Sequence, residues 1–261
     1  MRARIREAAT CDHGAMSQPG IPAAVTARSR WRTRWPRLLA VGVLLLGGVF
    51  ALGSCFSAPV YRGPESDHFD GEVFRNQDPL PERGLGSVLR WKLGSEPASW
   101  DGYAPERVTS EVLERVHGAA LRVTFVGHAT WLVQTAGLNV LTDPIWSERC
   151  SPVSWAGPAR YVEPGLAFEA LPPIDVVLIS HNHYDHLDLP TLRRLADGHG
   201  PTVAVPLGNT ALLDEHAIDG GLDMDWWDRL ELGEGRALTC VPAQHFSGRG
   251  LSDRDRTLWA G

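Results

Sequence analysis

Apolar and polar positions divide the chain into one long apolar run near the amino terminus and a later series of short apolar segments. Residues 38–52 are fifteen consecutive apolar or glycine positions, and five arginines lie within the ten residues before them. The length falls between a signal-peptide core of about 7–15 residues and a spanning helix of about 20. Flanking arginines and internal glycines do not suit a buried core helix, so the run predicts a targeting or membrane-anchoring segment.

Short apolar runs between turn residues predict the strands of a globular domain. Three of them form a meander over 122–126, 130–135 and 139–142, joined by turns at Gly127 and at Ala136-Gly137. The run Ile174–Ile179 is nearly continuous in apolar, β-branched residues and predicts a buried central strand. Residues 237–241 predict another strand, and residues 257–260 the opening of one more.

A helix is predicted shortly after the central strand. Asp188 and Pro190 suit its first turn, Leu192 and Leu195 lie on one side, and Gly198 suits its end. The residues between strand and helix therefore form a loop at the strand's carboxyl end.

That loop contains the strongest chemical signal in the chain, His181-Asn182-His183-Tyr184-Asp185-His186. Alternation along an extended segment directs His181 and His183 to one side, and a following turn directs Asp185 and His186 elsewhere. The alternative, histidines gathered by chance on a solvated loop, does not account for this packing of ligand types. The pattern predicts one pair of ligands for each of two metal ions.

Imidazole and carboxylate ligands favour zinc, with iron or manganese as alternatives. A catalytic zinc leaves one position open for a water whose pKa falls to about 7. Two ions roughly 3.5–4 Å apart can share that hydroxide and hold a substrate oxygen.

The H-x-H-x-D-H pattern after an apolar strand resembles the signature of the metallo-β-lactamase superfamily. Within it the chain is most similar to N-acyl-phosphatidylethanolamine-hydrolysing phospholipase D and its bacterial relatives. The resemblance covers about residues 118–261 and rests on further motifs in the same order: Val126-Gly127-His128-Ala129-Thr130, Leu141-Thr142-Asp143-Pro144-Ile145, Ser151-Pro152, Gly157-Pro158 and Pro242-Ala243-Gln244-His245-Phe246.

The resemblance implies that His181, His183 and His245 hold one zinc and that Asp185 and His186 hold the other. It also implies a layered α/β fold, an αββα sandwich, whose carboxyl-terminal half would be missing here, together with a bridging Asp and a last His. A complete site would hold two zinc ions, and this chain, taken as an amino-terminal fragment, would hold one.

The function implied by the resemblance is a zinc-dependent phosphodiesterase acting on a phospholipid through a metal-bound hydroxide. No side chain is assigned as the catalytic group, and Asp185 is the candidate assisting base. One alternative is a lactonase or other carbonyl hydrolase acting on a small-molecule ester. A second alternative is a catalytically silent, membrane-tethered fragment that binds at most one metal.

The amino-terminal half divides into three predicted regions: a basic polar leader over 1–37, a signal peptide or anchor over 38–55, and an irregular arm over 56–117. Leu52-Gly53-Ser54-Cys55 resembles a bacterial lipobox, so a lipoprotein and an uncleaved anchor are both open. Arginines before the apolar run place the domain of residues 118–261 on the non-cytoplasmic side of the cell envelope.

Charge limits the partners of the globular part. Eight of the 25 basic residues and two of the 31 acidic residues lie in the first 55, which leaves 17 basic against 29 acidic. This imbalance argues against nucleic acid as partner or substrate.

Several other polar and aromatic positions have two interpretations each. Asp67, His68 and Asp70 suit a capped turn better than a further metal site. His128 and Asp143, at predicted strand ends, could orient a ligand imidazole or cap the structure. A lipid pocket and core packing are the two interpretations for Trp146, Trp155, Trp226 and Trp227. For Cys150 and Cys240 they are a disulfide and two free thiols.

Overall fold

The computed structural model describes residues 27–79, 84–96 and 112–261. The chain divides into two compact units, residues 1–48 and residues 49–261. Most of the predicted leader (1–26) and two parts of the predicted arm (80–83 and 97–111) lie outside the described residues. The boundaries of leader, anchor, arm and domain stay predictions.

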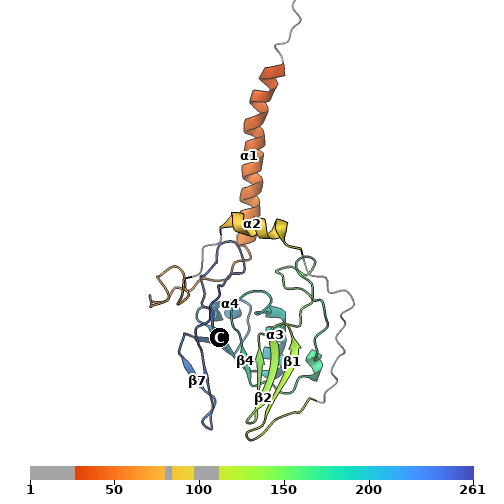
Figure 1. The fold of residues 1–261 in the computed structure, drawn as a ribbon, viewed down its shortest axis with the longest axis vertical. Helices are drawn as coiled ribbons and strands as arrows, with labels where there is room; N and C mark the ends of the chain where they lie inside the picture. Colours follow the sequence, from red (N-terminus) through yellow and green to blue (C-terminus); the bar gives the residue numbers. More distant parts are fainter. Residues whose placement is uncertain (1–26, 80–83, 97–111) are drawn as a thin grey trace, which may run out of the picture. The chain divides into compact units, whose positions relative to one another are not determined.

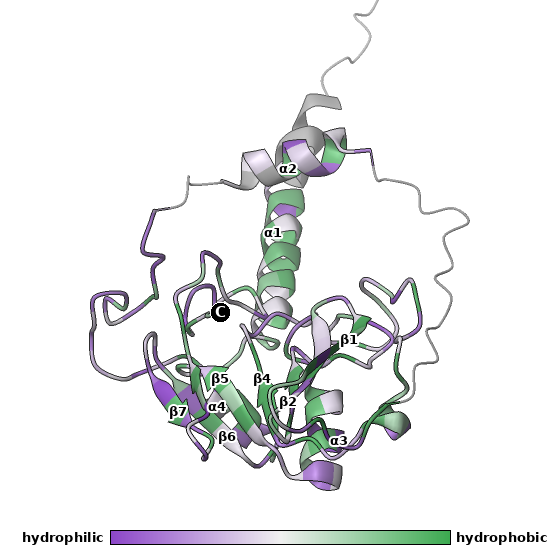
Figure 2. Ribbon diagram, turned by 60° about the horizontal axis from the view of Figure 1, so that its bottom comes forward, coloured by the Kyte–Doolittle hydropathy of each residue, from purple (hydrophilic) through white to green (hydrophobic). Residues whose placement is uncertain are grey.

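The first helix, α1, covers Ala27–Ser54 and contains the predicted apolar run. Its residues Trp35–Ser54, twenty in number with a mean hydropathy of 1.9, are long and apolar enough to cross a membrane. Figure 2 shows the hydrophobic colouring of this stretch. A signal sequence has the same properties, so α1 has the length and composition of a signal or a membrane anchor.

A mixed sheet of six strands forms the centre of the second unit, in the order β1-β2-β3-β4-β5-β6 (Figure 1). The first three strands are an antiparallel meander, as predicted, and β4 to β6 continue the sheet in parallel with β3. Their bounds are Leu121–Gly127, Thr130–Thr135, Leu138–Thr142, Val176–Leu178, Thr202–Pro206 and Gly221–Met224. The predicted mixed α/β class is confirmed.

One face of the sheet is covered by two helices, α3 (Leu189–His199) and α4 (Thr210–Glu215). Their buried leucines pack against strand residues that include Val177 of β4 and Val203 of β5. In Figure 2 the ribbons of β4 and β5 carry the hydrophobic colours of central strands.

The opposite face is covered mainly by segments without regular structure. Alternation along β5 sends Ala204 to this face, where it joins Phe69 and Phe74 of the predicted arm. Leu258 and Trp259, almost fully buried, complete the same cluster. The arm therefore contributes two aromatic side chains to the core of the domain.

Several sequence predictions need correction at their boundaries. Helix α3 continues past Gly198 and ends on Gly200, whose positive φ of 59° suits a glycine cap and whose N–H donates to the carbonyls of Leu195 and Ala196. The arm is not wholly irregular, because it contains helix α2 (Leu85–Gly94).

Residues 257–260 do not form the predicted strand. Leu258 N–H donates to Leu207 O and Ala260 N–H to Ser180 O, so the segment bonds two separate parts of the chain and has no ladder with one neighbour. The predicted strand at 237–241 is shorter, β8 (Ala237–Thr239), and pairs with β7 (Arg229–Glu231). A short 3₁₀ turn, η1, covers Phe168–Ala170.

The buried arm aromatics give a test of this packing. Replacing Phe69, which is 2% exposed, by alanine should lower the free energy of unfolding by about 3–5 kcal/mol, because it removes buried apolar area and leaves a cavity. Phe125→Ala is the matched control, since Phe125 is 53% exposed on β1, and should cost well under half as much. Urea unfolding of the full chain in detergent measures both, and equal losses would show that the arm is not part of the core.

Candidate metal centre

The histidine loop, residues 181–186, begins shortly after β4 and contains a turn that changes the direction of the chain. The N–H groups of His186 and Leu187 both donate to the carbonyl of His183, at 3.1 and 2.8 Å. His181 and His183 lie before the turn and Asp185 and His186 within it, and the ring centroids of His181 and His186 are 4.1 Å apart. The loop lies at the carboxyl end of a parallel strand, where the active sites of α/β sheets commonly lie.

The first cluster consists of three imidazoles, those of His181, His183 and His245. Nε2 of His181 lies 2.7 Å from Nδ1 of His183 and 3.1 Å from Nε2 of His245. Tetrahedral zinc with Zn–N bonds of 2.0–2.1 Å needs nitrogens about 3.3–3.4 Å apart, so small side-chain adjustments would admit the ion. The three residues fit a zinc site with an open fourth position.

The surroundings of this cluster favour neutral imidazoles. Burial, followed by the neighbouring histidines, lowers the pKa of His181 to about 2 and that of His183 to about 4. Burial also lowers the pKa of His245. Neutral imidazole is the form that binds a metal, because its lone pair is free.

The second cluster contains Asp185, His186 and His128. Oδ2 of Asp185 lies 2.9 Å from Nε2 of His128 and 3.5 Å from Nε2 of His186. Although burial alone lowers it, hydrogen bonds to Asp143 and Asp185 raise the pKa of His186 to about 9. Hydrogen bonding to His186 keeps the pKa of Asp185 well below its usual value. An environment that favours a proton on His186 also favours a divalent cation there.

His128 was left outside the predicted ligand set, and the structure places it in this cluster. It occupies the turn between β1 and β2 with a positive φ of 52°, a conformation uncommon for a residue other than glycine. The sequence signal was its position in Val126–Thr130, directly after a strand.

Asp143 connects the two clusters through hydrogen bonds. It follows β3, is 7% exposed, and its Oδ2 accepts from Ser180 Oγ at 2.8 Å and from His186 Nδ1 at 2.8 Å. Because the Ser180 hydroxyl proton points to Asp143, its oxygen accepts from His181 Nδ1 at 2.9 Å. These bonds place lone pairs on Nε2 of both His181 and a neutral His186, which is the orientation a metal requires.

The histidine loop is also braced from the segment that follows His245. A single terminal nitrogen of Arg249, Nη1, donates to the carbonyls of Asn182 and Leu187 at 2.8 and 2.9 Å, and its guanidinium lies 3.8 Å from the centre of the Tyr184 ring. Asn182, 1% exposed, accepts from Gly248 N–H and donates to Thr257 Oγ1. No feature of the sequence near Arg249 indicated this contact.

The other polar candidates do not form a common site. Asp70 accepts from the N–H groups of Glu72 and Val73 and pairs with Arg75, which is the predicted capped turn. The two ring nitrogens of His68 bond the carboxylates of Asp67 and Asp225, at 2.5 and 2.8 Å.

The four tryptophans do not gather in one lipid pocket. Trp146 packs at the edge of the helix-covered core, and Trp226 is buried on the opposite face. Trp155 and Trp227 are exposed. Core packing therefore explains two of the four.

The alternative disulfide does not form, because Cys150 and Cys240 are both free thiols. Burial raises the pKa of Cys240 to about 12, so this thiol stays protonated at neutral pH.

One family model and several curated relatives match this chain. Residues 138–261 match the model of a beta-lactamase superfamily domain. An uncharacterized protein of Mycobacterium tuberculosis is 37% identical over 232 residues, which cover 85% of this chain and 62% of that protein. N-acyl-phosphatidylethanolamine-hydrolyzing phospholipase D 1 of Caenorhabditis elegans is 39% identical over 153 residues, covering 55% of this chain and 43% of the nematode protein.

A metal-dependent hydrolase of Anaeromyxobacter sp. is 33% identical over 130 residues, covering 48% of this chain and 43% of that protein. The chain thus spans 62% or less of the length of these curated relatives.

The Asp143 carboxylate gives the first test of the centre. Asp143→Asn should weaken zinc binding about 10–100-fold, because the amide no longer accepts from both Ser180 and His186 as a carboxylate does. Asp223→Asn is the matched control, since Asp223 also accepts three bonds, from Asn209 N–H and from the N–H and hydroxyl of Thr210, away from the loop. Competition with a chromogenic chelator measures both, and equal zinc affinity in the two variants would contradict the assigned role.

The Arg249 brace gives a second test. Arg249→Lys should also weaken zinc binding, by about tenfold, because an ammonium lacks the planar group that stacks on Tyr184 while donating to two carbonyls. Arg229→Lys is the control on the exposed strand β7, where Arg229 pairs with Glu231. Unchanged zinc affinity after Arg249→Lys would show that the loop does not need the brace.

Proposed function

We propose that residues 138–261, which match the model of a beta-lactamase superfamily domain, carry the metal centre of a zinc-dependent phosphodiesterase. The proposed substrates are lipids resembling N-acyl-phosphatidylethanolamine. The observation that carries the proposal is the convergence of His181, His183 and His245, three imidazoles from two distant segments, beside Asp185 and His186.

The choice of substrate rests on likeness to one named relative. The nematode protein that shares 39% identity over 153 residues is named for hydrolysis of N-acyl-phosphatidylethanolamine. Fold alone does not decide the reaction, because one superfamily scaffold serves several substrates. Helix α1 supports a lipid substrate, since a membrane anchor would keep the domain close to lipid. We place the domain on the non-cytoplasmic side of the envelope, with lipidation of the exposed Cys55 as the alternative mode of attachment.

His181, His183 and His245 would hold the first zinc, and Asp185 and His186 the second, with His128 as a candidate third ligand. Bound zinc supplies two kinds of chemistry, acidification of a water and polarisation of a phosphoryl oxygen. The chain's own groups hold protons at defined atoms. His181 Nδ1 donates to Ser180 Oγ and His186 Nδ1 to Asp143 Oδ2, so neither ring turns away.

Asp185 is the proposed proton acceptor. Its pKa lies well below the usual value, so the carboxylate is ionised at neutral pH, and it is only half-buried. As the alternative to holding the metal, the imidazole of His128, 2.9 Å away and half-exposed, is placed to receive a proton from Asp185 or pass one to solvent.

Zinc content and turnover of the full chain in detergent test the proposal. Elemental analysis should find at least one zinc per chain, and His183→Ala should abolish binding at the first site because only two imidazoles remain. His117→Ala is the control, since His117 is exposed and belongs to neither cluster. Zinc content that survives His183→Ala unchanged would refute the ligand assignment.

Turnover separates the three readings of the function. Hydrolysis of a chromogenic phosphodiester and of N-acyl-phosphatidylethanolamine in micelles supports the proposal. Hydrolysis of a lactone in place of the phosphodiester overturns it in favour of a carbonyl hydrolase. Bound zinc without either activity identifies a silent metal-binding chain.

A further inference from the structure

His245 lies in a part of the chain that no regular structure fixes. Strand β8 ends at Thr239, and residues 240–246 belong to no helix or strand. The neighbouring imidazoles follow β4 closely, but the backbone of His245 has no such support. Nevertheless its Nε2 lies 3.1 Å from Nε2 of His181. Some contact other than a strand ladder must hold the His245 backbone.

That contact is the side chain of Asn76, which comes from the arm 169 residues earlier. Asn76 Oδ1 accepts from His245 N–H at 2.9 Å, and Asn76 Nδ2 donates to His245 O at 2.8 Å. Both polar backbone groups of His245 are therefore satisfied by one carboxamide. The pair reproduces the two bonds that a neighbouring strand would supply.

The orientation of the Asn76 carboxamide is itself fixed. The indole N–H of Trp259 donates to Asn76 Oδ1 at 3.0 Å and to Ala243 O at 2.9 Å. Two N–H donors thus face Oδ1 and one carbonyl faces Nδ2, so only one orientation of the amide satisfies all three. Trp259 is 1% exposed, which keeps its indole in place.

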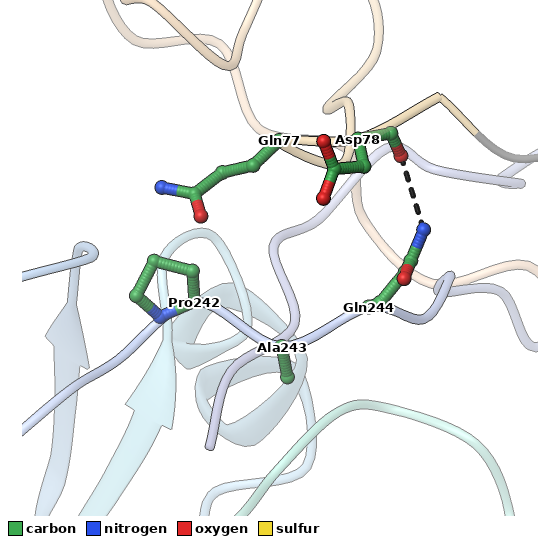
Figure 3. Close-up of a pocket in the computed structure, with 5 residues that line it drawn as sticks. All are labelled: Gln77, Asp78, Pro242, Ala243 and Gln244. Carbon is green, nitrogen blue, oxygen red and sulfur yellow. Dashed lines mark hydrogen bonds between the residues drawn. The ribbon is translucent and has the colours of Figure 1, made fainter.

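The arm around Asn76 is held on both sides. Phe74, two residues earlier, is 2% exposed in the cluster that covers the sheet, and its N–H donates to Asp255 O at 2.7 Å. On the other side Gln244 Nε2 donates to Asp78 O at 3.2 Å, across a polar pocket of about 150 Å³ (Figure 3). Figure 3 shows Gln77 and Asp78 facing Pro242, Ala243 and Gln244, the residues just before His245.

We propose that Asn76 is a positioning residue for the first metal, acting only through His245. The inference rests on the proposed metal centre and adds to it a part of the chain that lies outside the matched domain. The arm thereby becomes part of the metal centre as well as part of the core. Without Asn76 the His245 backbone loses both bonds, and the third nitrogen of the site is no longer held near His181.

The experiment is a double-mutant cycle on metal affinity, with Co²⁺ as a spectroscopic probe of the full chain in detergent. Asn76→Ala should raise the Co²⁺ dissociation constant about tenfold or more and reduce the visible absorption of tetrahedral cobalt. In a His245→Ala background, titrated to a Co²⁺ excess at which the two remaining imidazoles still bind, the same substitution should change neither, because the residue through which it acts is already gone. A loss that is equal in both backgrounds would mean that Asn76 only stabilises the fold, and would overturn the proposal.

Two further variants keep the result interpretable. If Asn76→Ala does not fold, Asn76→Asp takes its place in the experiment. The aspartate retains the bonds accepted from His245 and Trp259 but sets a carboxylate oxygen against His245 O, so it should also weaken Co²⁺ binding. Asn139→Ala is the matched control, since Asn139 is fully buried and donates to the carbonyls of Glu114 and Pro173, and it should lower thermal stability without changing Co²⁺ affinity.

The outcomes also separate this inference from the proposed function. A wild-type chain that binds no Co²⁺ overturns both. A wild-type chain that binds Co²⁺, together with an Asn76→Ala variant that binds it equally well, overturns the positioning role alone.

Discussion

The hydrogen bonds of Asp143 are the interaction on which the metal centre depends. One buried carboxylate determines which nitrogen of His186 carries a proton, and through Ser180 it does the same for His181. A metal needs a lone pair directed at it, and an imidazole free to rotate or exchange tautomers offers that only part of the time. Because β3 and β4 are parallel neighbours, Asp143 and the histidine loop necessarily emerge at the same edge of the sheet. The topology of the sheet thus sets the chemistry of both clusters.

The remaining support comes from segments far away in sequence. Arg249 holds the two ends of the histidine loop, and Asn76 holds the backbone of His245. Asn76 is anchored in the face of the sheet that the helices do not cover, where the arm aromatics meet Trp259. The packing that stabilises this face therefore also determines how closely the imidazoles approach each other, so metal binding and tertiary stability should be coupled.

The sequence predicted those parts of the structure whose signal is local. The central strand, the meander, the helix start at Asp188 and the grouping of His181 with His183 each follow from residues a few positions apart. The helix end at Gly200 was misplaced because Gly198 offers the same signal two residues earlier, and the arm helix α2 was missed among turn residues. Arg249 and Asn76 had no local signal at all, because their roles arise from contacts that only tertiary folding creates.

The two clusters differ in charge, and this difference would order the binding of two ions. The first cluster offers neutral imidazoles only, whereas the second places Asp185 and Asp143 around His186. Two divalent cations about 4 Å apart repel strongly, and carboxylates between or beside them reduce that repulsion. Within the described residues Asp185 is the one carboxylate in either cluster, and its charge acts on all three imidazoles of the first. Three well-oriented nitrogens therefore favour binding of a first ion. A second ion must overcome the electrostatic repulsion from the first with the help of a single carboxylate, so the first site should fill before the second.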